Sequence, residues 1–181
     1  MAAVIFAEQP WHDGEKRMHE LMNFPGLDNP SVPRLSSQAA AMLQRAPLLA
    51  IGTLDEKGRP WASIWGGDAG FGRALPQLDN HIAVKVDVDG KYDPVVEQLL
   101  GTVSQNAGGG MREGLRGKMV SALSIDLESR KRVKLFGRAV AGALGSGEDE
   151  EGRATAVAQL IVGIEQSLGA YDHARLCLQR S

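Results

Sequence analysis

Two long apolar segments near the end of the chain, KMVSALSIDL and RVKLFGRAVAGAL, are separated only by the polar turn ESRKR. Apolar residues at alternate positions indicate β-strands, and a turn this short predicts that the two strands form an antiparallel hairpin. An earlier pair, LLAIGTL and WASIWGG around the turn DEKGRP, has the same organisation. Two such hairpins predict that a sheet is the main element of the fold.

Two further segments complete the expected sheet. HIAVKVDV has apolar residues at alternate positions, which predicts a further strand beside the two hairpins. ATAVAQLIVGIEQSLG permits a strand or a helix, and we favour a strand because it follows a long strand through the acidic loop GSGEDEEGRA. The sequence therefore predicts a mainly β (α+β) protein, a small barrel or split barrel of five or six strands.

Helices are expected to be few and short. HDGEKRMHELM can form two or three helical turns, with Met18, Leu21 and Met22 on one side. SQAAAMLQRA can begin at a cap provided by Ser36 or Ser37, and DPVVEQLLG at a cap provided by Asp93. The proline-rich stretch NFPGLDNPSVPRL predicts an arm or linker with little regular structure.

Composition excludes several classes of protein. The 181 residues fit one domain, and a net charge of −2 gives no support for nucleic-acid binding. One cysteine, Cys177, permits no internal disulfide and suits a reducing compartment. No apolar run is long enough to span a membrane, and the first residues lack the features of a signal peptide. We expect a soluble cytoplasmic protein.

No familiar catalytic motif is present. The four histidines are scattered without metal-ligand spacing, so no metal site is expected, and the serines lack a nucleophile motif. No catalytic residue is assigned; His12, His19 and His81 are candidates only for substrate contact. The glycine-rich run GGGMREGLRGK is interpreted either as a solvated loop or as a loop whose cations contact an anionic ligand.

Two strands carry patterns that suit a ligand. Arg132, Lys134 and Arg138 fall on one face of their strand with Phe136, which suits a phosphate but also protects a sheet edge from aggregation. In WASIWGG, both tryptophans share a face with Ser63, and two glycines follow. That face suits a flat heterocycle with polar edges, and equally a barrel core or a dimer interface.

The order of these segments, from LLAIGTLDEKGRPWASIWGGDAGF through DPVVEQLL to GKMVSALSIDLESRKRVKLFGRAVAGAL, resembles the pyridoxamine 5'-phosphate oxidase-like family of FMN-binding split barrels. WHDGEKRMHEL is similar to the start of the family's flavin-nucleotide-binding branch, which forms the front part of larger flavoproteins. The resemblance covers about residues 10–169. It implies an N-terminal arm with a short helix (1–34), an FMN-binding split-barrel domain (35–169) and a diverged tail (170–181).

The resemblance also implies a six-stranded antiparallel split β-barrel with short flanking helices, which forms a homodimer with FMN at its interface. The implied activity is that of an FMN-dependent oxidoreductase acting on a small organic substrate. The isoalloxazine would be lined by Ala62, Ser63, Ile64 and Trp65, with its rim shaped by Gly66, Gly67 and Phe71. The candidate phosphate partners are Arg116, Lys118, Arg130 and Arg132.

The chain departs from this branch after its last strand. The expected Asn-Cys-Pro-Lys-Tyr motif is replaced by AYDHARLCLQRS, and no reductase module follows in this sequence. An external reductase or free reduced flavin would then be needed, whether the chain stands alone or is part of a longer flavoprotein. Three alternatives stay open: a flavin-binding protein without turnover, a haem-binding split barrel, and a cofactor-free barrel with a non-redox activity such as isomerisation.

Overall fold

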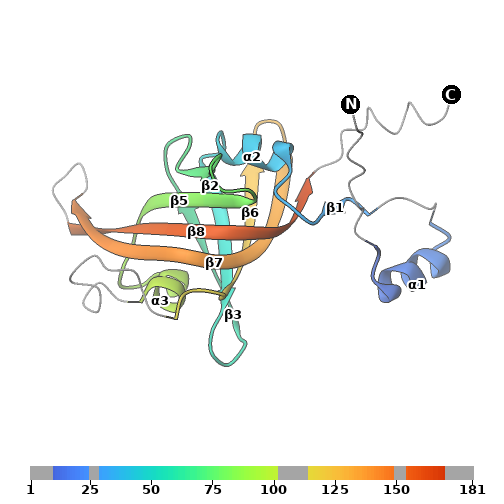
Figure 1. The fold of residues 1–181 in the computed structure, drawn as a ribbon, viewed down its shortest axis with the longest axis horizontal. Helices are drawn as coiled ribbons and strands as arrows, with labels where there is room; N and C mark the ends of the chain where they lie inside the picture. Colours follow the sequence, from blue (N-terminus) through green and yellow to red (C-terminus); the bar gives the residue numbers. More distant parts are fainter. Residues whose placement is uncertain (1–9, 25–28, 102–113, 149–153, 170–181) are drawn as a thin grey trace.

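The computed structural model describes residues 10–24, 29–101, 114–148 and 154–169, and it is mainly an antiparallel β-sheet with three short helices (Figure 1). The helices are α1 (Asp13–Leu21), α2 (Ser37–Leu43) and α3 (Pro94–Leu100). The strands are β1 (Ser31–Val32), β2 (Leu48–Leu54), β3 (Pro60–Gly66), β4 (Gly72–Ala74), β5 (His81–Val88), β6 (Met119–Asp126), β7 (Lys131–Glu148) and β8 (Ala154–Gly169).

All six segments predicted as strands are strands, including the ambiguous one, which is β8. The structure adds two strands, so that the described part of the chain holds eight where the sequence predicted six. β1 has two residues and β4 has three, too few to show a period of two. β1 lies in the stretch expected to be irregular, and it pairs with the end of β8.

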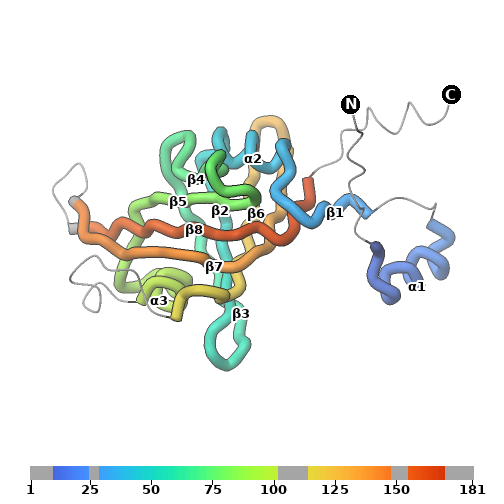
Figure 2. The backbone as a smooth tube through the Cα atoms, in the orientation of Figure 1, coloured from blue at the N-terminus to red at the C-terminus, as the bar shows by residue number. Residues whose placement is uncertain are grey.

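The order of strands in the sheet is β3-β2-β6-β7-β8-β5-β4, with β1 beside β8. The two edge strands, β3 and β4, are neighbours in sequence, joined by residues 67–71 alone. A connection this short spans at most about 20 Å, so the sheet must curl until its edges approach each other. The result is a barrel that is not closed by hydrogen bonds between β3 and β4 in the described residues, and we call the gap between them the seam. Figure 2 follows this path through the curled sheet.

The core lies inside the curl, where alternate residues of every long strand meet two helices. β2 buries Leu49 and Ile51, and β5 buries Ile82, Val84 and Val86. α2 contributes Ala39, Met42 and Leu43, and α3 contributes Val95, Val96, Leu99 and Leu100. These helices therefore close the ends of a continuous apolar interior.

The helices begin where the sequence predicts. The Ser36 hydroxyl accepts a hydrogen bond from the Ala39 N–H, and the Asp93 carboxylate accepts from the N–H groups of Val95 and Val96. Pro94 follows directly as the first residue of α3, where its missing N–H costs nothing. Within the described ranges, no helix combines the length and the apolar composition that crossing a membrane requires.

Candidate functional site

β3 presents an unpaired backbone edge. It pairs only with β2 among the described strands, and Gly67, just past its end, donates its N–H to the Pro47 carbonyl at 3.1 Å. Hydrogen bonds alternate along an antiparallel pair, so the odd-numbered residues of β3 bond to β2. The N–H and C=O groups of Ala62, Ile64 and Gly66 point the other way, toward the open edge. β3 thus offers a row of donors and acceptors beside the seam.

The side chains of β3 alternate between two faces, as predicted, but the face with Ser63 and Trp65 points into the protein. Ser63 Oγ donates to Asp93 Oδ1 at 2.7 Å, and Trp65 Nε1 donates to Asp93 Oδ2 at 2.8 Å. The Trp65 indole is 2 % exposed and belongs to the core. The side that β3 shows to solvent carries Ala62 and Ile64 instead. Of the predicted indole wall, Trp65 therefore attaches β3 to the start of α3, whereas Trp61 is 39 % exposed and bonds to Asp55.

The hairpin before β3 is held by one carboxylate. Asp55 accepts hydrogen bonds from the N–H groups of Lys57 and Arg59, from Arg59 Nε and from Trp61 Nε1. The backbone N–H of Arg59, with smaller contributions from the Arg59 and Trp61 side chains, lowers the pKa of Asp55 well below its ordinary value. A carboxylate that stays ionised in this turn fixes the direction in which β3 begins.

A pocket lies at the seam, next to the last residues of β3, with a volume of ≈ 370 Å³. A tight turn forms its rim: the Phe71 N–H donates to the Asp68 carbonyl at 3.0 Å, and Gly70 has φ +90°, a conformation that favours glycine. The residues that line this seam pocket are Gly66, Gly67, Asp68, Ala69, Gly70, Phe71, Arg73, Ala83, Lys85, Val86, Asp87 and Val157. Three of them were predicted as site residues from the sequence: Gly66, Gly67 and Phe71.

Two cations stand in the seam pocket. Arg73 lies opposite Ala83 in the β4–β5 ladder, and Lys85 is two residues further along β5 on the same outward side. Both side chains are exposed, and neither forms a salt bridge within the described part of the chain. Asp68 and Asp87 line the same pocket without neutralising them by direct pairing. Guanidinium and ammonium groups placed together beside a glycine-rich turn suit an anionic ligand such as a phosphate.

The four cations predicted as phosphate partners are divided into two pairs. Lys118 and Arg116 lie before β6, whereas Arg130 lies in the turn after it and Arg132 lies opposite Ile125 near its far end. From Lys118 to the level of Ile125 there are seven steps of about 3.3 Å along the strand, roughly 23 Å in all, so one phosphate cannot reach both pairs of the same chain. Lys118 Nζ donates to the Gln98 carbonyl at 2.6 Å. Arg73 and Lys85 were not predicted from the sequence, although Arg73 directly follows the glycine-rich GGDAGFG.

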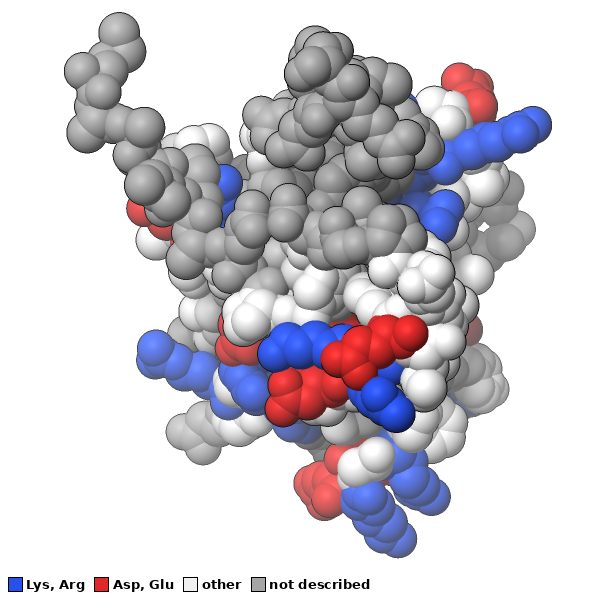
Figure 3. All heavy atoms as spheres, turned by 90° about the vertical axis from the view of Figure 1, so that its right-hand side faces the viewer, with Lys and Arg blue, Asp and Glu red and all other residues white. Residues whose placement is uncertain are grey.

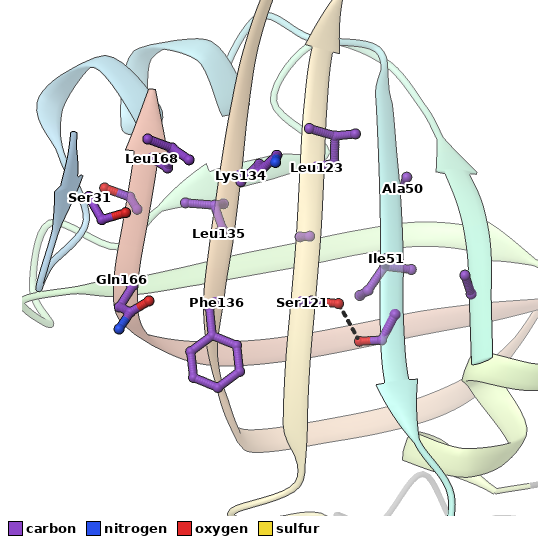
Figure 4. Close-up of a pocket in the computed structure, with 14 residues that line it drawn as sticks. Ser31, Ala50, Ile51, Ser121, Leu123, Lys134, Leu135, Phe136, Gln166 and Leu168 are labelled. Atoms are coloured by element: carbon purple, nitrogen blue, oxygen red, sulfur yellow. Dashed lines mark hydrogen bonds between the residues drawn. The ribbon is translucent and has the colours of Figure 1, made fainter. Parts of the chain in front are cut away.

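A second hollow, of ≈ 450 Å³, lies on the outside of the sheet over β2, β3, β6, β7 and β8 (Figure 4). We call this surface the outer sheet face. Its floor is made of small residues, Ala50, Gly52, Ala62 and Ser121. Leu123, Phe136, Leu168, Lys134, Gln166 and Ser31 surround this floor. Most of the lining is apolar, which is unusual for a surface left open to water.

The predicted row of cations on β7 is confirmed. Arg132, Lys134 and Arg138 are exposed and Phe136 is half-buried, while the residues between them, such as Val133 and Leu135, are buried. The row lies on the outer sheet face and its margin. Arg138 Nε pairs with Glu165 Oε1 at 3.0 Å, whereas Arg132 and Lys134 form no salt bridge with any described residue.

The histidines are placed individually. His12 caps α1, His19 lies between the rings of Trp11 and Phe24, and His81 Nδ1 is 2.6 Å from the Asp79 carbonyl. His173 and Cys177 lie outside the described residues. Over the described ranges, no three His, Cys, Asp or Glu side chains gather as a metal site would require.

No protein-family model and no curated protein matches the chain. Similar solved structures include an F420 reductase (9 % identity, 70 % of this chain and 93 % of that one, TM-score 0.41). They also include a pyridoxamine 5'-phosphate oxidase-related, FMN-binding protein from Nostoc punctiforme (15 %, 68 % and 54 %, TM-score 0.35). A third is HutZ, a heme storage protein from Vibrio cholerae (13 %, 76 % and 96 %, TM-score 0.39). These superpositions are loose and carry no residue's role over to this chain.

Proposed function

We propose that the chain binds FMN and acts as an FMN-dependent oxidoreductase on a small organic substrate. The observation that carries this proposal is the continuity of two features: the free backbone edge of β3 runs directly into the seam pocket with its two cations. A ligand that matches both features has a flat polar heterocycle at one end and an anionic group at the other. FMN is such a molecule.

The edge of β3 fits the heterocycle. Ala62, Ile64 and Gly66 direct both N–H and C=O groups outward, and the polar edge of an isoalloxazine carries acceptors and a donor in one plane. The small side chain of Ala62 and the absence of one at Gly66 let a ring approach the backbone closely. Ser63 and Trp65 would not contact the ring. They would hold β3 in position, because their hydrogen bonds to Asp93 fix the strand to α3.

The seam pocket fits the phosphate. Arg73 can donate two parallel hydrogen bonds to phosphate oxygens, and Lys85 adds a compact positive charge. The turn at residues 68–71, closed by the Phe71 N–H bond to the Asp68 carbonyl, forms the rim beside these two cations. Bound FMN would supply the hydride or electron transfer that no side chain of this protein can perform. The chain itself would bind, orient and shield the cofactor from water.

The proposal includes a homodimer of split barrels in which the outer sheet face of each copy is covered by the other copy. This face exposes Ile64 (75 %) and Leu48 (38 %) beside Leu123, Phe136 and Leu168. Apolar surfaces of this kind on soluble proteins mark interfaces. Electrons would come from an external reductase or from reduced flavin, and the single cysteine suits the reducing cytoplasm.

The test compares FMN with riboflavin, which lacks the phosphate. We expect the purified protein to show a flavin absorption spectrum after FMN is added. Arg73→Ala and Lys85→Ala should each weaken FMN affinity about tenfold or more, because each removes a charge-assisted contact. Riboflavin affinity should change little. Arg130→Ala and Arg116→Ala serve as matched controls that leave FMN affinity unchanged.

The outcomes separate the parts of the proposal. A control variant that weakens FMN binding while Arg73→Ala does not would contradict the placement of the phosphate. A protein that ignores both flavins would refute the function, and a red-brown haem spectrum would favour the haem alternative. Flavin binding without reduction of any tested acceptor would leave a carrier rather than an enzyme.

A further inference from the structure

α1 is a helix whose residues are all left unburied by the described part of the chain. It has nine residues, none of them buried, and it stands clear of the barrel in Figure 1. Isolated helices shorter than about 12 residues are marginal in water, and most short helices in proteins are stabilised by packing an apolar side. The described part of the chain therefore does not provide the packing that a helix as short as α1 usually needs to be stable.

The charged side of α1 is already satisfied. Lys16 pairs with Asp13 at 3.1 Å and Arg17 with Glu20 at 2.9 Å. The His12 side chain and Glu15 form a capping box at the start of the helix. The side of the molecule that carries α1 accordingly shows acidic and basic side chains next to one another (Figure 3). This side needs no protein partner.

The opposite side of α1 is apolar and uncovered. Met18, Leu21 and Met22 are three and four residues apart, so they form one stripe along the helix. Their exposed fractions are 53 %, 65 % and 62 %, and Phe24 just beyond the helix is 48 % exposed. An amphipathic helix with a bare apolar stripe is built to lie on an apolar surface.

The arm around α1 has a defined shape. The His19 ring meets Trp11 edge-on at 4.8 Å between centroids and stacks on Phe24 at 5.4 Å. These contacts join the residues before, within and after the helix. The arm thus presents its stripe as a preformed unit, which lowers the entropy cost of docking.

The outer sheet face is the matching surface. It carries the exposed Ile64 beside the half-buried Leu123 and Phe136. Its charges that pair with no described residue, Arg132 and Lys134, are positive. α1 carries three acidic and two basic residues, so its excess charge is negative. The two surfaces are therefore both apolar and opposite in net charge. Both belong to the same chain, and both are exposed to solvent.

We propose that α1 docks on the outer sheet face of a second copy of this chain, and that the two copies exchange their arms. The inference rests on the homodimer in the proposed function and adds to it. The arm of one copy would cover the side of β3 that carries Ala62 and Ile64 in the other. Each flavin edge would then be shielded from water by residues of both copies.

Mixed cross-linking tests the exchange on the full chain. In a Cys177→Ser background, one protein carries Leu21→Cys and the other carries Ile64→Cys, with a mass tag on the second. The two are mixed and treated with a short bismaleimide, so that a tagged mixed product can form only between copies. Lys16→Cys replaces Leu21→Cys as the matched control, because Lys16 lies on the charged side of the same helix. We expect the mixed product with Leu21→Cys and its loss with Lys16→Cys.

Two results would overturn the exchange. One is no mixed product at protein concentrations where the solution mass is that of a dimer. The other is cross-linking only inside a single chain that carries both Leu21→Cys and Ile64→Cys, which would place α1 on its own sheet face. Flavin titration of the same samples tests the two proposals separately. A cross-linked dimer that does not bind FMN would support the arm exchange and contradict the flavin function. A monomer that binds FMN would support the flavin function and contradict the arm exchange.

Discussion

Asp93 joins the helix that closes the core to the strand that borders the seam. Its two oxygens accept hydrogen bonds from Ser63, Trp65 and the N–H groups of Val95 and Val96, all between 2.7 and 3.0 Å. A carboxylate with four donors is held in one orientation, and it holds the donors in turn. The sequence shows Asp93 only as a helix cap. Its contacts with β3 depend on residues 28 and 30 positions away, which no local pattern reveals.

We expect Asp93→Asn to destabilise the fold by about 1–3 kcal/mol, because the amide nitrogen cannot accept and one buried donor is left unsatisfied. Trp65 Nε1 is the donor at risk, since the indole is 2 % exposed. Guanidinium unfolding followed by tryptophan fluorescence measures the change. Asp89→Asn is the matched control: Asp89 accepts from the Lys91 and Tyr92 N–H groups at the surface, where water replaces lost bonds. Equal stability of the two variants would show that the contacts with Ser63 and Trp65 are dispensable.

At the scale of elements, sequence patterns locate the long strands and the capped helices but not the pairing that builds the site. β2, β3, β5, β6, β7 and β8 each show their apolar positions in sequence, because one face of each is buried. β4 shows no pattern in three residues, yet it places Arg73 beside Lys85. That proximity follows from the order of strands around the barrel. The sequence therefore suggests phosphate partners among cations that are clustered in sequence, whereas Arg73 and Lys85 are brought together only in space.

The long β7–β8 hairpin bends where its register shifts, near Phe136 and Gly137 and again between Ala139 and Ala141. Such bulges let the strands curve around the barrel. Gly137 allows the close crossing, because a Cβ there would run into the Gly163 carbonyl. The glycine is thus required by the fold rather than by turn chemistry.

We expect Gly137→Ala to destabilise the protein by about 2–4 kcal/mol, since the added methyl can be accommodated only if the two backbones separate. Gly145→Ala, on the same strand, is the control, because its nearest neighbour, the Val157 carbonyl, is 4.0 Å from the added Cβ. Thermal unfolding of both variants by circular dichroism measures the difference. A Gly137→Ala protein as stable as the control would mean that the bend at the bulge relaxes freely.

At the scale of the whole molecule, the barrel and the arm differ in what holds them. The barrel has a continuous core under α2 and α3, whereas α1 buries no residue. Stability of the barrel should therefore be a property of one chain, and order in the arm a property of the assembly. The two surfaces left bare, the apolar stripe of α1 and the outer sheet face, are what a monomer would expose to water.

Removal of residues 1–24 separates these two contributions. We expect the shortened chain to keep its β-sheet circular dichroism, and its free energy of unfolding at low protein concentration to stay within about 0.5 kcal/mol of the full chain, because no described residue of the deleted segment is buried. The full chain should unfold at a denaturant concentration that rises with protein concentration, as a dimer does, and the shortened chain should lose most of that dependence. Guanidinium unfolding at several protein concentrations measures both quantities. A shortened chain that is already less stable as a monomer would show instead that the arm packs on its own barrel, and equal concentration dependence in the two chains would show that the arm takes no part in the dimer.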